Sequence, residues 1–281
     1  MIWTDAVAEL SKTNTGFVVV TVLSVKGSSP RSEQTKMVVA AKRIFDSVGG
    51  GNLEFEAIKI ARSMLQSAEA NIEKHEYKLG PDLIQCCGGS VELLFEHFPA
   101  CDFNVVLCGA GHVGKALMSI LSELPCRVQW IDSRSEVLEN AVADFTENSR
   151  IRSTKLLNPY QTIEQCPPGS WYLIMTHSHE MDFELCEAVL GREDLRYCGL
   201  IGSKSKAVNF RTRLKKKGFS DSEVSKLNSP IGIAVGSGKT PMEVAVSISA
   251  QLLQLYYGET DLKPEDVSKR FTVVGQRERG Q

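Results

Sequence analysis

The chain has 281 residues, of which 42% are hydrophobic and 23% are charged. This composition is typical of a soluble globular protein, and the length favours two domains, because single hydrophobic cores stop growing efficiently above roughly 250 residues. The 32 basic and 34 acidic side chains give a net charge of -2. That balance excludes a strongly electropositive nucleic-acid-binding surface at the level of the whole chain, although it does not exclude a local basic patch.

The apolar segments predict neither a secretory signal nor a membrane span. The first ten residues include Asp5 and Glu9 and lack the basic region that opens a signal peptide. The longest apolar run, residues 16–25, is well short of the ~20 residues that cross a bilayer. We therefore expect a protein that does not act at a membrane.

The eight cysteines indicate a reducing compartment, and we expect a cytoplasmic protein. They form no C-x-x-C pair, and several stand in apolar runs, where a free thiol behaves as a small hydrophobic residue. The vicinal pair Cys86 and Cys87 differs, because Gly88 and Gly89 follow it directly. In a glycine turn a thiolate can be presented to a ligand, while the alternative is a pair of buried spectator thiols.

The first hundred residues predict a small domain of mixed helix and strand. Valine-rich residues 17–25 and residues 36–40 are expected to form strands, and the turn between them ends in Arg31. Further along the chain we expect a glycine turn at 49–51, an amphipathic helix from Glu54, a strand over 90–98 and a boundary at Pro99.

After Pro99 the pattern changes to a regular alternation of strands and helices. Residues 104–108 form a continuous apolar run, as expected of a strand buried on both faces of a parallel sheet. Such alternation implies α/β: a C-terminal Rossmann-like doubly wound parallel sheet with a smaller N-terminal mixed α/β domain. The expected domains are 1–99, 100–258 and a polar tail over 259–281, and the expected later elements are strands over 127–131, 171–175 and 197–201 and a helix from Thr240 to Tyr257.

Residues 109–114, Gly-Ala-Gly-His-Val-Gly, leave an expected strand and open an expected helix. That context is the one in which G-x-G-x-x-G binds a dinucleotide. The glycines permit a tight turn, and the helix N-terminus offers N–H groups to a phosphate. The candidate binding residues in this turn are Gly109, Gly111, His112 and Gly114.

Asp132 ends the next expected strand, where a carboxylate can bond a ribose diol. Arg134, two residues further on, either faces a phosphate or is simply exposed. The alternative for the whole segment is a Rossmann-type domain whose site binds nothing.

Two other loops follow expected strands and should open at the same edge of the sheet, where ligands of open α/β sheets bind. Their candidate residues are His177, His179, Gly202, Ser203 and Lys204. The histidines suit metal binding or proton transfer, but they equally suit local packing, and the spacing identifies no third metal ligand.

Seven basic residues stand between 204 and 217, a pattern that usually marks the solvated face of a helix. Lys204 and Lys206, near the start of that helix, are the ones expected to reach an anionic ligand. Residues 236–240 suggest a phosphate-binding P-loop, but the required first glycine is replaced by Ile233, so Thr240 is interpreted as a helix cap.

Taken in order, nine segments resemble the xanthine dehydrogenase accessory family (XdhC/CoxI), and together they cover nearly the whole chain. Any one of them is common, but nine in the right order are highly specific. The sequence departs from the family pattern at Ser229, where many relatives have cysteine, and before the triple glycine, where the segment is short; the second departure weakens any role for Arg31. The matching segments are 27–31, 49–54, 87–89, 109–114, 132–134, 176–179, 201–204, 230–232 and 240–241.

The resemblance implies a chaperone that binds finished molybdenum cofactor (molybdopterin), protects it while a sulfido ligand is installed, and delivers it to a client. That client is xanthine dehydrogenase or a related molybdenum hydroxylase, and a cysteine desulfurase is a further expected partner. A homodimer is expected, and no turnover of its own. Arg31 and Cys87 then join the cofactor-binding residues named above, with Cys87 as the candidate contact to molybdenum.

The main rival interpretation is an NAD(P)-dependent oxidoreductase, since the turn at 109–114 with Asp132 would serve NAD equally well. The sequence contains no Tyr-x-x-x-Lys pair and no acid–base constellation beyond the two loop histidines. Fold alone does not confer a reaction. A third alternative is a nucleotide site that regulates a protein-binding surface.

Overall fold

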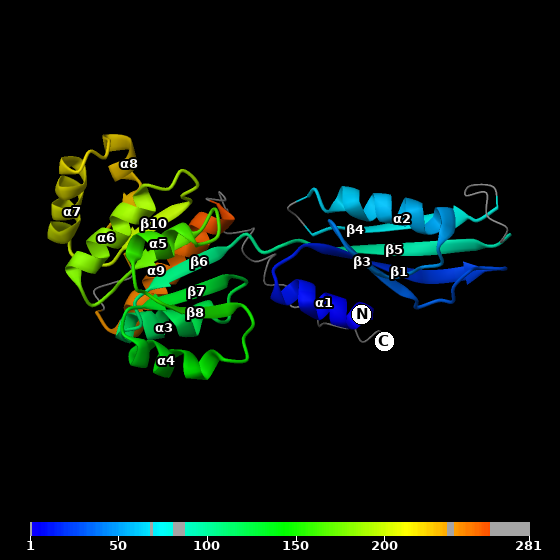
Figure 1. Ribbon diagram of the computed structural model, residues 1–281, viewed down its shortest axis with the longest axis horizontal. Coiled ribbons are helices and arrows are strands. Elements are labelled where there is room, and N and C mark those ends of the chain that lie inside the picture. Colours follow the sequence, from blue (N-terminus) through cyan, green and yellow to red (C-terminus); the bar gives the residue numbers. More distant parts are fainter. Residues whose placement is uncertain (1, 68–69, 81–87, 235–238, 259–281) are drawn as a thin grey trace, which may run out of the picture. The chain divides into compact units, whose positions relative to one another are not determined.

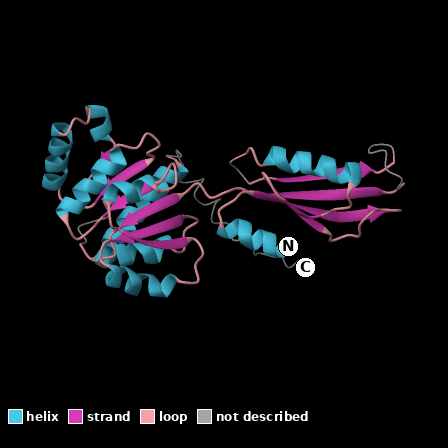
Figure 2. Ribbon diagram, in the orientation of Figure 1, coloured by secondary structure: helices cyan, strands magenta, loops and turns pink. Residues whose placement is uncertain are grey.

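The computed structural model describes residues 2–67, 70–80, 88–234 and 239–258. By its internal contacts the chain divides into two compact units, Met1–Asp102 and Phe103–Gln281 (Figure 1). Each unit has a β-sheet at its centre and helices packed outside it (Figure 2). Cys86 and Cys87 lie outside the described residues, so the expectations placed on them stay predictions.

The N-terminal unit is built on an antiparallel sheet in the order β3-β2-β1-β5-β4. The long central strands β1 and β5 pair along almost their whole length. The elements are α1 (Trp3–Lys12), β1 (Phe17–Lys26), β2 (Lys36–Ala40), β3 (Ile44–Asp46), α2 (Gly51–Met64), β4 (Ile72–Lys78) and β5 (Ser90–Phe98).

Strand β1 explains why its sequence is a continuous run of valine. Successive side chains of a strand point to opposite faces. Val18, Val20 and Val22 pack in the cluster that includes α2, and Phe17 and Val19 pack in the cluster that includes α1. Both faces of the strand are therefore buried, and no polar alternation is left in the sequence.

The C-terminal unit contains a parallel sheet in the order β11-β10-β9-β6-β7-β8. Within this unit the chain begins in the middle of the sheet at β6 and continues outward through β7 to β8. It then crosses back to β9, on the other side of β6, and continues outward through β10 to β11. This is the doubly wound order of dinucleotide-binding folds, so the expected Rossmann-like sheet is confirmed. The elements are β6 (Asn104–Cys108), α3 (His112–Leu121), β7 (Arg127–Asp132), α4 (Ser135–Val142), a 3-10 turn (Ala143–Phe145), β8 (Ile151–Lys155), α5 (Pro159–Glu164), β9 (Trp171–Ile174), α6 (His179–Leu190), β10 (Tyr197–Leu200), α7 (Lys204–Lys216), α8 (Asp221–Ser225), β11 (Leu227–Asn228) and α9 (Pro241–Tyr257).

Helices cover both faces of the parallel sheet. On one face, Val106 and Cys108 of β6 belong to a core shared with α5, α6 and α7. On the other, α9 packs against α3 and its Tyr256 ring stacks on Phe103 at 4.2 Å between ring centroids. The start of α9 is the expected capping box, because Thr240 and Glu243 exchange side-chain and backbone hydrogen bonds.

The buried cysteines of the C-terminal unit are free thiols. Cys108, Cys186 and Cys198 are completely buried, and burial raises the pKa of Cys108 and of Cys186 well above the ordinary value of a thiol. Cys108 and Cys186 therefore stay protonated. All three thiols pack as small hydrophobic groups, as expected from their apolar surroundings in the sequence. Over the described ranges, no helix combines the length and the apolar character needed to cross a membrane.

Candidate functional site

The sequence-predicted site residues of the C-terminal unit stand at or just after the carboxyl ends of β6, β7, β9 and β10 in the parallel sheet. Gly109 follows β6 with a φ of +122°, and a Cβ atom there would lie 2.3 Å from the carbonyl oxygen of Met175, just after β9. Only glycine therefore lets the ends of β6 and β9 approach this closely. This approach lies between the two strands where the winding direction reverses, which is where such sheets bind ligands.

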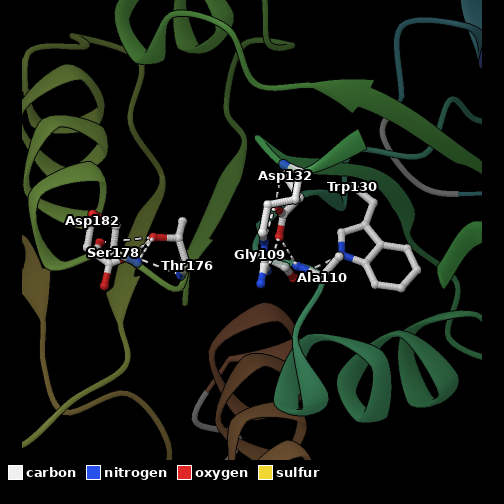
Figure 3. Close-up of polar contacts among 8 residues, drawn as sticks. Gly109, Ala110, Trp130, Asp132, Thr176, Ser178 and Asp182 are labelled. Carbon is white, nitrogen blue, oxygen red and sulfur yellow. Dashed lines mark hydrogen bonds and ion pairs between the residues drawn. The ribbon is translucent and has the colours of Figure 1, made fainter. Parts of the chain in front are cut away.

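Gly114 and Trp130 fix how α3 leaves the turn. A Cβ atom at Gly114 would lie 2.1 Å from the carbonyl oxygen of Gly109. The same oxygen accepts a 3.0 Å hydrogen bond from Nε1 of Trp130, whose side chain is fully buried (Figure 3). Packing inside the unit therefore accounts for a glycine at position 114. Trp130 was not singled out from the sequence, although a buried indole N–H requires a partner.

Gly111 is different, because no contact among the described residues requires a glycine there. Its backbone is extended, with φ -74° and ψ -171°, and a Cβ atom there would meet no atom of the described residues within 4 Å. It precedes the first residue of α3, the exposed His112, and no side chain caps this helix. The space beside Gly111 is therefore open at a helix start, where backbone N–H groups receive anions.

Asp132 and Arg134 form a closed arrangement at the end of β7. Oδ1 of Asp132 accepts bonds from the backbone N and the Nε of Arg134, each at 2.9 Å. Oδ2 accepts bonds from the backbone N of Ala110 and from Nη2 of Arg134, each at 2.7 Å (Figure 3). The carboxylate thus ties β7 to the glycine turn, and it holds Arg134 in the place where a ribose diol was expected.

Burial of the Asp132 side chain opposes its ionisation, since only 1% of it is exposed. The hydrogen bonds from Arg134 and Ala110 outweigh that cost and lower the pKa of Asp132 to about 2. The carboxylate is therefore ionised at neutral pH. Arg134 keeps 36% of its side chain exposed, and within the described part of the chain its Nη1 atom has no recorded partner.

A second buried carboxylate, Asp182, organises the loop after β9. Its Oδ1 accepts bonds from the backbone N and the Oγ1 of Thr176, at 2.9 and 2.7 Å (Figure 3). Its Oδ2 pairs with Nζ of Lys206 at 2.6 Å, and that ammonium also bonds the carbonyl of Ile201 at 3.0 Å. The network joins the loops after β9 and β10.

This network corrects one expectation and adds one residue. Lys206 was expected to reach an anionic ligand, but its side chain is 10% exposed and is spent on Asp182. Asp182 was not predicted as a site residue, because it is 24 residues from Lys206 in the sequence and no local pattern links the two.

The remaining candidates of these loops are exposed or half-buried. Ser178 and Ser203 cap α6 and α7, accepting bonds from the backbone N of the residue three positions on. His177, His179 and Lys204 lie on the surface beside these caps, and Gly202 has a φ of +155° and packs against Lys206. Among the residues that the structure describes, no group of three or more His, Cys, Asp or Glu side chains is arranged to hold a metal ion.

The N-terminal unit gathers three of the segments singled out in its sequence. The backbone N of Gly89 bonds the carbonyl of Ser28 at 3.1 Å, and a Cβ atom at Gly89 would lie 2.4 Å from that oxygen. A Cβ atom at Gly49 would lie 2.6 Å from Cγ of Pro30. The glycines therefore let the three segments pack together, beside the exposed Arg31.

Comparison with known families gives two matches to this chain. Residues 10–77 match the XdhC and CoxI family, and residues 105–252 match the XdhC Rossmann domain. The chain is also similar to the uncharacterized protein YqeB of Escherichia coli (strain K12), with 26% identity over 278 residues. That alignment covers 97% of this chain and 50% of YqeB, so the chain spans about half the length of the curated relative it matches.

Solved structures that are similar to the chain include the following two. A crystal structure described as a xanthine dehydrogenase from Bacillus halodurans has 20% identity and a TM-score of 0.48, over 95% of this chain and 99% of that one. A putative short chain dehydrogenase/reductase family oxidoreductase from Aeromonas hydrophila has 16% identity and a TM-score of 0.35, over 57% of this chain and 94% of that one.

Proposed function

The chain belongs to the XdhC and CoxI family, and from that premise we propose that it binds molybdenum cofactor, supports its sulfuration and delivers it to a molybdenum hydroxylase. Xanthine dehydrogenase or a related enzyme is the proposed client, and a cysteine desulfurase is the proposed source of sulfur. The proposal includes a cytoplasmic homodimer without turnover of its own. The Rossmann unit supplies the binding site.

The observation that carries the proposal is the open space beside Gly111. A Cβ atom at Gly109 or Gly114 would lie 2.3 or 2.1 Å from a backbone oxygen, so packing explains these glycines. A Cβ atom at Gly111 would meet no described atom within 4 Å. Packing among the described residues does not explain the glycine at this position, which lies at the start of a helix without a side-chain cap. Such a position suits the close approach of a ligand's phosphate. Molybdenum cofactor carries a phosphate on its pterin side chain, so the residues present fit that part of the group.

In this proposal the chain's own residues bind and orient the cofactor. The backbone N–H groups from Gly111 onward and the Arg134 side chain hold the phosphate, while Asp132 keeps the turn closed. The Asp182 network fixes the loop that presents His177 and His179. When bound, the cofactor supplies the molybdenum centre on which the client enzyme's chemistry depends.

An NAD(P)-dependent oxidoreductase is the second candidate, and the observation that favours it is the same glycine turn at the switch point of the sheet. The hydrogen bonds of Asp132 argue against binding of NAD in the usual way, with the ribose diol on this carboxylate. Both carboxylate oxygens are occupied by Ala110 and Arg134, so the ribose diol of NAD has no free acceptor there.

Reconstitution of a cofactor-free molybdenum hydroxylase tests the proposed function. The chain purified from molybdate-grown cells should restore hydroxylase activity, and the same chain from cells starved of molybdate should not. The chain alone should not oxidise NADPH or NADH with small carbonyl substrates. Robust oxidation by the chain, together with no effect on the hydroxylase, would favour the oxidoreductase instead.

A further inference from the structure

We infer that the end of β7 selects a phosphate monoester: Arg134 binds the phosphate, and Asp132 is a positioning residue for Arg134 rather than a ribose ligand. The inference rests on the proposed function in one respect only, namely that the switch-point turn holds a ligand. It adds the chemical class that the site accepts and the class that it rejects.

The first step is the hydrogen-bond capacity of Asp132. A carboxylate has about four lone-pair sites, and four donors already occupy them: the backbone N of Ala110 and the N, Nε and Nη2 of Arg134. Two of these donors are fixed backbone groups. A ribose diol bound to Asp132 would have to displace the guanidinium and leave both the carboxylate and Arg134 without their best partner.

The second step is the donor capacity that Arg134 retains. A guanidinium has five N–H donors in a rigid fork, and the bonds to Asp132 use Nε and one hydrogen of Nη2. The side chain is 36% exposed, while its partner is buried. The carboxylate of Asp132 therefore holds the guanidinium of Arg134 in one orientation and leaves N–H donors for a second anion. A planar guanidinium can bind two phosphate oxygens at once.

The third step is the source of the phosphate. The 2′-phosphate of NADP and the terminal phosphate of the pterin cofactor share the same chemistry, a phosphate monoester. NAD lacks this group and offers only the diol. The pair NADPH and NADH therefore isolates the monoester, because the two molecules differ in nothing else.

The experiment titrates the full chain with NADPH and NADH, followed by nicotinamide fluorescence. NADPH should bind at least about tenfold more tightly than NADH, as expected for one charge-assisted bidentate contact. Arg134→Gln should remove that preference, and Arg134→Lys should keep part of it. Arg152→Gln removes the same charge from the exposed face of β8 and should leave the preference unchanged.

Asp132→Asn tests the positioning role. It should lower the ratio of NADPH to NADH affinity while Arg134 and its charge remain, a change that a loss of stability alone does not produce. Thermal midpoints of all variants show which of them are folded at the titration temperature. NADH binding as tightly as NADPH, or a preference that survives Arg134→Gln, overturns the inference.

If neither nucleotide binds, the molybdenum content of the same purified variants decides. A loss of about tenfold or more in Arg134→Gln, but not in Arg152→Gln, assigns the monoester to the pterin cofactor and supports the inference. Equal content in both variants overturns it. A chain that prefers NADPH but carries no molybdenum keeps this inference and contradicts the proposed function, so the two failures are distinguishable.

Discussion

Replacing Gly111 with alanine separates ligand binding from folding at the glycine turn. The added Cβ atom meets no atom of the described chain within 4 Å, and any residue can adopt the extended backbone at this position. As a helix N-cap, alanine is less favourable than glycine by up to about 1 kcal/mol. The smaller conformational entropy of the unfolded alanine chain offsets about 0.4–1 kcal/mol of this.

We therefore expect the free energy of unfolding of Gly111→Ala to stay within about 1 kcal/mol of the parent. Gly114→Ala is the matched control, because its Cβ atom would lie 2.1 Å from a backbone oxygen. Overpacking of this kind costs about 1–3 kcal/mol or more. The two variants add the same methyl group three residues apart, one into open space and one into the protein.

The assay measures urea unfolding by circular dichroism and, on the same preparations, the molybdenum content of the purified chain. Gly111→Ala should retain its stability and lose about tenfold or more of the bound cofactor, since the methyl group occupies the space proposed for the phosphate. A loss of more than about 2 kcal/mol of stability would show that Gly111 is structural, because that exceeds the capping cost. If Gly111→Ala changes neither the stability nor the cofactor content, the proposal that the phosphate occupies the space beside Gly111 is refuted.

Two further predictions concern the buried carboxylates. Because the pKa of Asp132 is lowered to about 2, its ion pair stabilises the folded chain by about 2 kcal/mol above about pH 4, the pKa of an unfolded Asp, and this contribution disappears as the pH falls through about 2. The difference in unfolding free energy between the parent and Asp132→Asn should therefore shrink as the pH falls from about 4 to about 2. A difference that stays constant over this range would contradict the assignment. Lys206→Met leaves the buried Asp182 charge without its partner, so its thermal midpoint should fall by roughly 8–15 °C, corresponding to about 3–5 kcal/mol. Lys204 is an exposed neighbour, so Lys204→Met is the control and should change the thermal midpoint little. Equal shifts in the two variants would refute the role given to the ion pair of Asp182 and Lys206.

The sequence predicts the fold well where buried positions produce a clear pattern of apolar residues. The strands at 36–40, 90–98 and 104–108 have the expected bounds, because their buried side chains form continuous or alternating apolar runs. Strand β4, residues Ile72–Lys78, was missed, since its side chains are exposed or half-buried and its composition is polar. The short helices α5 and α8 were missed because they contain too few turns to show a helical period.

The candidate site shows the same limit more sharply. The sequence correctly placed Asp132 at the end of its strand, but the choice between binding a ribose and binding Arg134 depends on side-chain geometry. The contact between Asp182 and Lys206 depends on the packing of α6 against α7's first turn. Neither is visible in spacing, whereas the family resemblance was visible in ordered motifs and is confirmed by both family matches.

The central claim is that the switch-point turn of the Rossmann unit holds molybdenum cofactor. The most direct measurement is the molybdenum and pterin content per chain, determined in parallel for the parent and Gly111→Ala purified from the same molybdate-grown cells. The account predicts near-stoichiometric molybdenum and pterin in the parent and a large loss of both in the variant. A parent chain that carries bound NAD or NADP with neither molybdenum nor pterin would contradict it.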